Sequence, residues 1–254
     1  MQKWQLILAI LLTGPGLSGP HTANAQALPG GFVYLRAIDP GIIQDIRYAT
    51  SNNFIGRPLA GYAAGECVVK REVGRMLKSV QQELAPQRLS LKLFDCYRPV
   101  RAVTDMVAWS RDGNETPAQR RYNPAFRKQD LFRLGYIAER SGHSTGAAID
   151  LTLVDLTADN SATFDPARSY ADCTASVNRR APEASVDMGT GYDCSDTRAH
   201  TAAKSISSNQ RRWRDKLVEV MARHGFANYS KEWWHFSLPG VSGPAYDFPI
   251  QKPD

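Results

Sequence analysis

Two histidines of this chain lie in sequence contexts that suit metal binding. His143 lies among small residues in the segment SGHSTGAAID, and His235 lies in the aromatic segment EWWHF. Asp150, the last residue of the first segment, stands in an apolar run, where a carboxylate is costly unless a cation or a partner neutralises it. Two imidazoles and one carboxylate make a set of three zinc ligands that leaves the fourth position for water.

Glu232 opens the second segment, so it lies near His235 without having to be a ligand. A carboxylate there can take a proton from water as a general base. Each element also has an ordinary structural explanation, because a strand aspartate can pair with an arginine and a strand histidine can simply be hydrogen-bonded. Two further histidines suit such roles: His224 lies beside the glycine that stops a helix, and His200 is expected to face solvent in a polar loop.

Both helices and strands must position these residues. Apolar residues at helical spacing and alternating or continuous apolar runs predict the following elements: helices over about 68–85, 99–111, 126–133 and 207–224, and strands over 89–94, 147–153 and 233–238. The segment 31–62 is expected to be an extended entry with turns, and 155–187, poor in large apolar residues, an exposed insertion. Because strict β-α-β alternation is absent, the predicted class is α+β, a single domain with a central antiparallel sheet flanked by helices.

The composition is that of a soluble globular protein. The chain has 254 residues, of which 43% are hydrophobic and 22% charged, which excludes collagen-like and wholly disordered classes. The formal net charge is +6, but the basic residues are scattered and form no stripe with interleaved aromatics. Nucleic-acid binding is therefore not expected.

The first 25 residues have the pattern of a secretory signal. Lys3 provides a positive start, an apolar run LILAILL follows, and Ala23-Asn24-Ala25 forms a small-residue cleavage site. The apolar run is too short to span a bilayer, and no later stretch is longer, so no membrane span is expected in the mature chain. We therefore expect a single domain over 26–254 that is exported to the periplasm.

Four cysteines follow the signal, and an even number in an exported chain suggests disulfides. Of the three possible pairings we favour Cys67 with Cys96 and Cys173 with Cys194, because each pair brackets a local stretch of chain. Free buried thiols are the alternative. A four-cysteine metal site is not expected, since no C-x-x-C pair is present.

Several blocks, taken in order, resemble those of the zinc peptidases that include D-alanyl-D-alanine dipeptidases and D,D-carboxypeptidases. The resemblance is closer to the dipeptidases and is spread over nearly all of the chain after the signal. The blocks are DIRYAT (45–50), DCYRP (95–99), SGHSTGAAIDLTL (141–153), DMGT (187–190) with Asp193, EWWHF (232–236) and YDFP (246–249).

The resemblance implies a role for each matching residue in the reaction. It implies that His143, Asp150 and His235 bind one zinc ion, and that Glu232 is the general base. It also implies that Arg98 stabilises the developing oxyanion, a task that suits a guanidinium, which is always charged and presents fixed donors. Asp95 is expected to hold Arg98 in place, with a surface turn as the alternative.

The same resemblance implies that Tyr48, Ser141 and Asp193 line the pocket for the free amino end of a dipeptide. An anionic Asp193 suits an ammonium group and would discriminate against blocked or longer amino ends. Packing and turn hydrogen bonding are the alternatives for Tyr48 and Ser141. The segment between Leu153 and Asp187 is longer than in compact cytoplasmic members, and a disulfide-pinned loop there could change the preferred substrate length.

The expected function is zinc-dependent hydrolysis of D-Ala-D-Ala to two D-alanines, in cell-wall peptide turnover or scavenging. Two alternatives remain open. A zinc D,D-carboxypeptidase would act on longer peptidoglycan peptides and accept an acylated amino end. A module that binds wall peptides without catalysis would keep the zinc ligands and lack hydrolysis.

Overall fold

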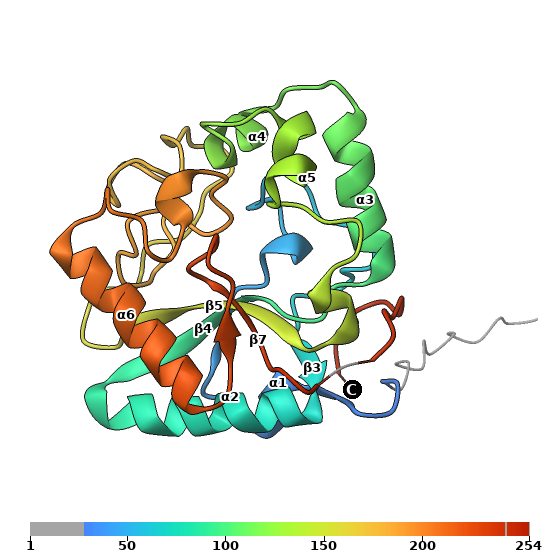
Figure 1. The fold of residues 1–254 in the computed structure, drawn as a ribbon, viewed down its shortest axis with the longest axis vertical. Coiled ribbons are helices and arrows are strands. Elements are labelled where there is room, and N and C mark those ends of the chain that lie inside the picture. Colours follow the sequence, from blue (N-terminus) through green and yellow to red (C-terminus); the bar gives the residue numbers. More distant parts are fainter. Residues whose placement is uncertain (1–27, 242, 254) are drawn as a thin grey trace, which may run out of the picture.

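The computed structural model of the protein describes residues 28–241 and 243–253, so the predicted signal peptide lies outside the described residues. Figure 1 shows a sheet with helices on either side of it. Five strands form this sheet in the order β2 (Ile43–Gln44), β4 (Leu89–Asp95), β5 (Ala148–Asp155), β7 (His235–Ser237) and β6 (Ala227–Asn228). The β2–β4 pair is parallel and the other three pairs are antiparallel, so the α+β class is confirmed and the sheet is mixed.

Strands β4 and β5 are the centre of the sheet. Every residue of β4 is buried, as is every residue of β5 except the last, which is what a strand covered on both faces requires. Their ladder is regular from Leu89 to Leu93, but Asp95, not Phe94, is paired with Asp150. This register shift places one extra residue in β4 beside the end of the strand.

Two long helices cover one side of the sheet (Figure 1). They are α2 (Arg71–Leu84), whose apolar side chains are almost fully buried, and α6 (Ser208–Arg223). Ser207 caps α6 in a capping box with Gln210, which satisfies backbone donors at the start of the helix. The remaining helices are short or lie on the other side: α1 (Leu35–Ile38), α3 (Val100–Arg111), α4 (Pro117–Tyr122) and α5 (Leu131–Leu134).

The first predicted helix begins three residues too early, because its start belongs to a second, two-stranded sheet. Residues 68–70 form β3 (Val68–Lys70), which pairs with β1 (Phe32–Tyr34), so the helix begins only at Arg71. The apolar residues at the start of the predicted helix therefore pair with a strand in the segment that we expected to be an extended entry with turns. Within that same segment, residues 35–38 form α1 and residues 43–44 form β2.

The other predicted elements are present with shifted ends. Pro99 precedes α3 as its cap instead of occupying its first turn, and the last predicted strand is reduced to His235–Ser237. The short helix predicted over 126–133 is a 3-10 turn, Lys128–Asp130, followed by α5. Among the described residues, no helix is both long and apolar enough to cross a lipid bilayer.

Both predicted disulfides are formed. Cys67 is bonded to Cys96 and Cys173 to Cys194. Residues 156–187 form no helix and no ladder, only an isolated bridge between Ala171 and Arg180. The segment is not uniformly exposed, because Cys173 and Arg180 are buried against the body of the protein. That it is an insertion stays a prediction.

Candidate active site

The sheet places two aspartates and one histidine in one row. Asp95, Asp150 and His235 are successive cross-strand partners on β4, β5 and β7. Directly paired residues in antiparallel strands share a face, so the three side chains lie side by side. The register shift in β4 is what puts Asp95, and not the preceding phenylalanine, opposite Asp150.

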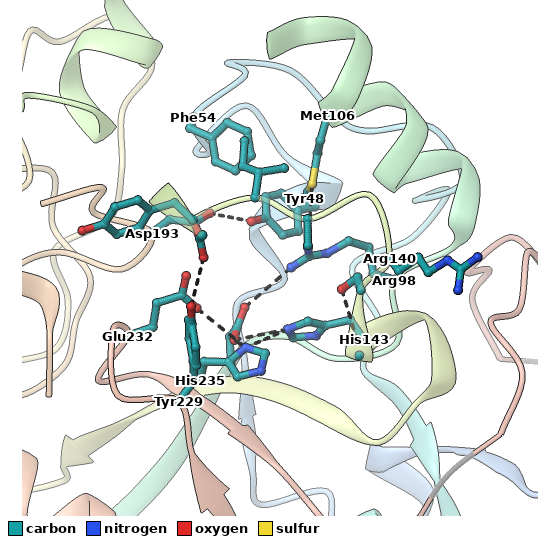
Figure 2. Close-up of a pocket in the computed structure, with 17 residues that line it drawn as sticks. Tyr48, Phe54, Arg98, Met106, Arg140, His143, Asp193, Tyr229, Glu232 and His235 are labelled. Carbon is teal, nitrogen blue, oxygen red and sulfur yellow. Dashed lines mark hydrogen bonds and ion pairs between the residues drawn. The ribbon is translucent and has the colours of Figure 1, made fainter. Parts of the chain in front are cut away.

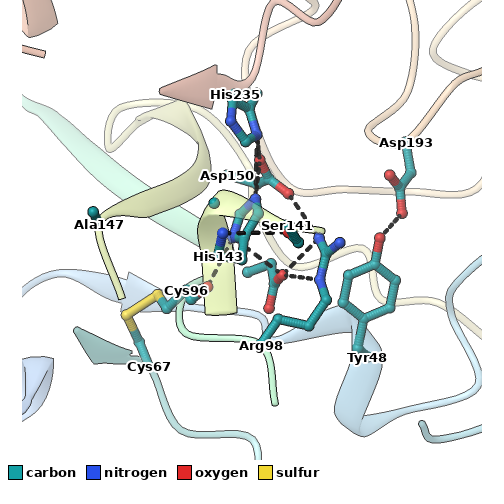
Figure 3. A network of polar contacts seen from close by, with 12 residues as sticks. Tyr48, Cys67, Cys96, Arg98, Ser141, His143, Ala147, Asp150, Asp193 and His235 are labelled. Carbon is teal, nitrogen blue, oxygen red and sulfur yellow. Dashed lines mark hydrogen bonds and ion pairs between the residues drawn. A yellow bond between two sulfur atoms is a disulfide. The ribbon is translucent and has the colours of Figure 1, made fainter. Parts of the chain in front are cut away.

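His143 joins this row from a 3-10 turn, Gly142–Thr145, directly before β5. Gly146 ends the turn with a φ of +78°, which lets the chain reverse into the strand. A side chain at Gly146 would also collide with Phe32, since a Cβ there would lie 2.3 Å from its ring. The chain therefore folds back at this turn, which brings the His143 imidazole next to Asp150 (Figure 3).

The donor atoms of His143, Asp150 and His235 converge. Nε2 of His143 lies 3.2 Å from Nδ1 of His235 and 3.3 Å from Oδ1 of Asp150, and the last two atoms are 3.0 Å apart. A tetrahedral zinc ion bound at about 2.0–2.1 Å from each ligand requires ligand atoms about 3.3 Å apart. The spacing of the three atoms therefore fits a zinc ion.

Protonation of these groups also fits a cation. The carbonyl of Cys96 can only accept, so Nδ1 of His143, 2.7 Å away, must donate to it and Nε2 is left with a lone pair. Burial alone would favour the neutral form of Asp150, but the imidazoles of His143 and His235 outweigh it and hold its pKa well below the usual range. The lone pair on Nε2 of His143 and the carboxylate of Asp150 thus face a common point, where a cation or a proton on Nδ1 of His235 would balance them.

Arg98 is held beside the ligand set by Asp95. One carboxylate oxygen of Asp95 accepts from Nε and lies 2.9 Å from Nη2 of the guanidinium, and its other oxygen accepts from the Tyr62 hydroxyl at 2.6 Å. Nη2 of Arg98 also lies 3.8 Å from Asp150. A guanidinium fixed in this way presents its remaining N–H groups to the pocket without having to reorganise.

Glu232 lies at the edge of the ligand set. Its Oε2 is 3.8 Å from Nδ1 of His235, and only 13% of its side chain is exposed. Burial, helped by the carboxylates of Asp150 and Asp193, raises its pKa well above the usual value. A divalent cation in the ligand set would oppose that shift, because it favours the ionised form of a nearby carboxylate.

The opposite end of the pocket is formed by Tyr48 and Asp193 (Figure 2). The Tyr48 hydroxyl donates to Oδ2 of Asp193 at 2.6 Å. Burial, opposed by this hydrogen bond, raises the pKa of Asp193 to about 7. Asp193 has a φ of +60°, in the left-handed region that non-glycine residues seldom adopt, and it directly precedes the disulfide-bonded Cys194.

Ser141 lies at the rim and caps the turn that carries His143. Its Oγ accepts from the backbone N–H of His143 at 3.2 Å, so the packing alternative accounts for at least part of its role. One cavity of about 240 Å³ is lined by the predicted metal ligands and by the predicted catalytic and substrate-binding residues, whereas Asp95 lies behind Arg98 and does not line it. The predicted residues that line it are Tyr48, Arg98, Ser141, His143, Asp150, Asp193, Glu232 and His235.

Comparison with known proteins agrees with this geometry. The sequence matches a family model described as D-ala-D-ala dipeptidase over residues 29–181 and 158–252. The chain belongs to the D-Ala-D-Ala dipeptidase family. It is therefore a peptidase, and the resemblance read from its sequence blocks is confirmed.

Curated relatives in this dipeptidase family are similar over almost their whole length. The chain is 34% identical over 223 residues to a D-alanyl-D-alanine dipeptidase of Enterococcus faecium, covering 87% of this chain and 98% of that protein. It is 33% identical over 225 residues to one of Streptomyces coelicolor, covering 88% and 100%. A third, from Enterococcus faecalis, is 31% identical over 211 residues, covering 83% and 93%.

Two contacts of this dipeptidase-family site were not predicted. The Tyr192 hydroxyl donates to Oδ2 of Asp150 at 3.0 Å, and the Tyr192 ring stacks on Phe94 with centroids 4.5 Å apart. The other is the Cys96 carbonyl that accepts from His143. Tyr192 stands next to the predicted Asp193, which was a usable signal, whereas nothing in a sequence marks one backbone carbonyl among many.

Two other histidines of the described residues, His224 and His200, lie outside the pocket. Nε2 of His224 is 2.8 Å from Glu83, which fits the structural role predicted at the end of α6. His200 is not simply solvent-facing, because it is partly buried and its Nε2 lies 3.3 Å from the Tyr136 hydroxyl. The prediction missed this because the loop that carries His200 packs against the segment after α5.

Proposed function

We propose that the protein hydrolyses free D-Ala-D-Ala to two D-alanines and that zinc is the metal. The observation that carries this proposal is that one cavity joins the ligand set, Glu232 and Arg98 to the Tyr48–Asp193 pair. The cavity, at about 240 Å³, is smaller than the roughly 300–1,000 Å³ of ordinary ligand pockets, which suits a small dipeptide. The names of the curated relatives support the same substrate.

His143, Asp150 and His235 would hold the zinc ion. When bound, zinc would supply a Lewis acid and lower the pKa of water. Glu232 then takes a proton from the attacking water and returns it to the leaving amine, as a general base that becomes a general acid.

Arg98 faces the oxygen of the scissile carbonyl as negative charge develops on it. Burial alone would lower the pKa of Arg98, but the Asp95 carboxylate raises it, so the guanidinium stays charged at every working pH. Asp95 positions that charge through two contacts, with Nε and with Nη2 of the guanidinium. The stabilising group is thus in place before the reaction begins.

Asp193 accepts the ammonium group of the substrate, with Tyr48 as its hydrogen-bonded support. An ammonium close to this partly buried carboxylate gains an ion pair that a neutral amide cannot make. An acylated substrate would leave Asp193 without a cation and would place its acyl group against Tyr48 and Phe54. The arrangement therefore favours a free dipeptide over a longer wall peptide.

Export to the periplasm, with a role in wall-peptide turnover or scavenging, is part of this proposal. The secretory pattern in residues 1–25 supports it, and so do the two disulfides, which persist in oxidising compartments. Cell fractionation and amino-terminal sequencing of the mature protein test it. Recovery of a full-length chain in the cytoplasm would contradict it.

Hydrolysis by the purified zinc-loaded protein tests the activity. Released D-alanine is measured from D-Ala-D-Ala and from N-acetyl-D-Ala-D-Ala, each with and without a chelator. We expect chelator-sensitive cleavage of the free dipeptide alone. Cleavage of the acetylated peptide would identify a carboxypeptidase, and bound metal without cleavage of either would identify a binding module.

Glu232→Gln is the matched variant for the proposed base. The amide keeps the size of the side chain but cannot take a proton, so kcat is expected to fall by about 10²–10⁴-fold. The zinc content, measured by atomic absorption, should stay at one ion per chain. Loss of zinc from this variant would make Glu232 a ligand and would overturn its assignment as the base.

A further inference from the structure

Cys96 belongs to a disulfide and also contacts a proposed metal ligand. It follows the last residue of β4, so the strand ladder no longer holds it. Its carbonyl accepts from Nδ1 of His143 at 2.7 Å, and its sulfur is bonded to Cys67 (Figure 3). Only Cys96 itself therefore lies between the Cys67–Cys96 disulfide and the His143 imidazole.

The other end of the disulfide is firmly anchored. Cys67 is fully buried directly before β3, its N–H donates to the Gln44 side chain at 2.8 Å, and its carbonyl accepts from the Leu35 N–H at 2.9 Å. The next residue, Val68, accepts from the Tyr97 N–H at 2.8 Å. The disulfide thus ties the chain after β4 to the two-stranded sheet.

His143 needs such support more than its two partners do. Asp150 and His235 are strand residues paired with one another, whereas His143 lies on a 3-10 turn. The chain after β4 holds His143 at two points, because the Arg98 N–H also donates to the His143 carbonyl at 3.2 Å. An acceptor for the second nitrogen of a metal-bound histidine fixes both its tautomer and its ring orientation.

We propose that the Cys67–Cys96 disulfide positions His143 for metal binding through the Cys96 carbonyl. This inference rests on the proposed zinc site and adds a positioning role for a covalent bond that lies outside the ligand set. Loss of an outer partner of a metal-bound histidine typically lowers metal affinity by about 10- to 100-fold. We expect a loss in that range when the disulfide is removed.

The second disulfide provides a matched control. Cys173–Cys194 is also buried, but it lies beside Asp193 at the other end of the pocket. Its backbone hydrogen bonds are to Arg121, Gly191 and Asp196 and not to a histidine. Removing it tests what the loss of any buried disulfide does to this protein. Its zinc affinity should stay within about threefold of the wild-type value, since no metal-ligand histidine loses an acceptor.

Zinc affinity is measured by competition with a chromophoric chelator for three proteins: wild type, C67S/C96S and C173S/C194S. The cobalt(II) absorption spectrum is recorded for each, because it reports ligand geometry independently of activity. We expect weaker zinc binding and a changed spectrum for C67S/C96S alone. Equal affinities in all three, or equal losses in both variants, would overturn the proposal, whereas a wild type that binds no zinc would overturn the proposed function.

A second measurement does not require C67S/C96S to fold. In metal-free C173S/C194S, nitrogen-15 NMR should show His143 protonated at Nδ1, with the signal assigned by its loss in a further His143→Gln change. Reduction then opens only Cys67–Cys96, and the Nδ1 proton should exchange with solvent at least tenfold faster. Protonation at Nε2, or exchange that reduction leaves unchanged, would overturn the proposal.

Discussion

The two ends of the pocket are built in different ways. The metal-ligand end rests on three adjacent strands, where Asp95, Asp150 and His235 are fixed by ladder pairing. The amine end rests on irregular chain: Tyr48 lies in a 3-10 turn, and Asp193 has left-handed backbone geometry outside any helix or strand. A disulfide lies beside each end.

This difference separates what each end can tolerate. At the metal-ligand end, the positions of Asp95, Asp150 and His235 follow from the sheet, so a substitution of these residues changes chemistry more than placement. At the amine end, one carboxylate is held by a single hydroxyl and by a strained backbone, so placement itself depends on a few contacts. Substitutions at the two ends should therefore alter different kinetic constants.

The largest expected effect is at Asp150. Asp150→Asn keeps the size of the side chain and an oxygen for the Tyr192 hydroxyl but removes the charge that offsets a cation. Loss of one of three ligands should release zinc and lower kcat/KM by at least about 10⁴-fold, the order that removal of an essential catalytic group costs. Zinc content and D-Ala-D-Ala turnover check this. Asp155→Asn at the other end of β5 is the control, and full zinc occupancy in Asp150→Asn would contradict the ligand assignment.

Arg98→Lys should have the next largest effect. Lysine keeps the charge but cannot present the fork of donors that contacts Asp95 and the pocket together. We expect kcat to fall by about 10²–10³-fold, as on removal of an oxyanion donor, with KM changed by less than about tenfold. Steady-state kinetics separate the two constants. A change confined to KM would mean that Arg98 binds the ground state and not the developing charge.

Asp193→Asn should act on KM instead. Asparagine tolerates left-handed geometry and keeps an acceptor for Tyr48, so only the charge is lost. Without an ion pair to the ammonium group, KM for D-Ala-D-Ala should rise by about 30-fold or more, and the preference over N-acetyl-D-Ala-D-Ala should shrink. An unchanged preference between the two substrates would remove Asp193 from amine recognition.

The pKa of Asp193, raised to about 7, gives this end a pH dependence. The ionised form binds the ammonium, so kcat/KM of the wild type should fall as pH drops below about 7, and Asp193→Asn should lack that limb.

The contribution of Asp193 to folding stability has the opposite pH dependence. A carboxyl whose pKa rises on folding costs stability as pH increases from its unfolded value of 3.8 through 7, so Asp193→Asn should stabilise the metal-free protein more at pH 8 than at pH 4. Thermal unfolding at the two pH values checks this.

Tyr48→Phe should have the smallest effect. It removes the hydroxyl that lowers the pKa of Asp193, so the acid limb of kcat/KM should move to higher pH. KM at pH 7 should rise by about three- to tenfold, in line with loss of one hydrogen bond to a charged group. Zinc affinity should not change. Weaker zinc binding in this variant would show that the two ends of the pocket are not independent.

The sequence predicts the metal-ligand end better than the amine end for a physical reason. A buried aspartate in an apolar strand and a histidine between glycines are unusual enough to be read one residue at a time. The 67–96 and 173–194 pairings are also predictable, because each pair brackets a local stretch of chain. Placement of Tyr48 against Asp193 joins segments far apart in the chain, so only the family resemblance indicated it.

Long-range pairing also explains the errors in the fold. Val68 and Val69 fit a helical pattern, and only their partners in β1 make them a strand. The Tyr192 hydroxyl bond to Asp150 likewise depends on how a loop without regular structure returns to the sheet. Periodicity reports local preference, and such contacts are decided by tertiary structure.

The register shift in β4 leaves one residue of that strand without a partner in β5. Leu93 faces Leu151 and Asp95 faces Asp150, so Phe94 is extra. Deleting Phe94 would leave the other pairs in place, at the cost of the ring that stacks on Tyr192. A second unpaired residue between Leu93 and Asp95 would instead move the Asp95 carboxylate away from Arg98. Shortening the central strand at this point would thus keep the register that lengthening would break.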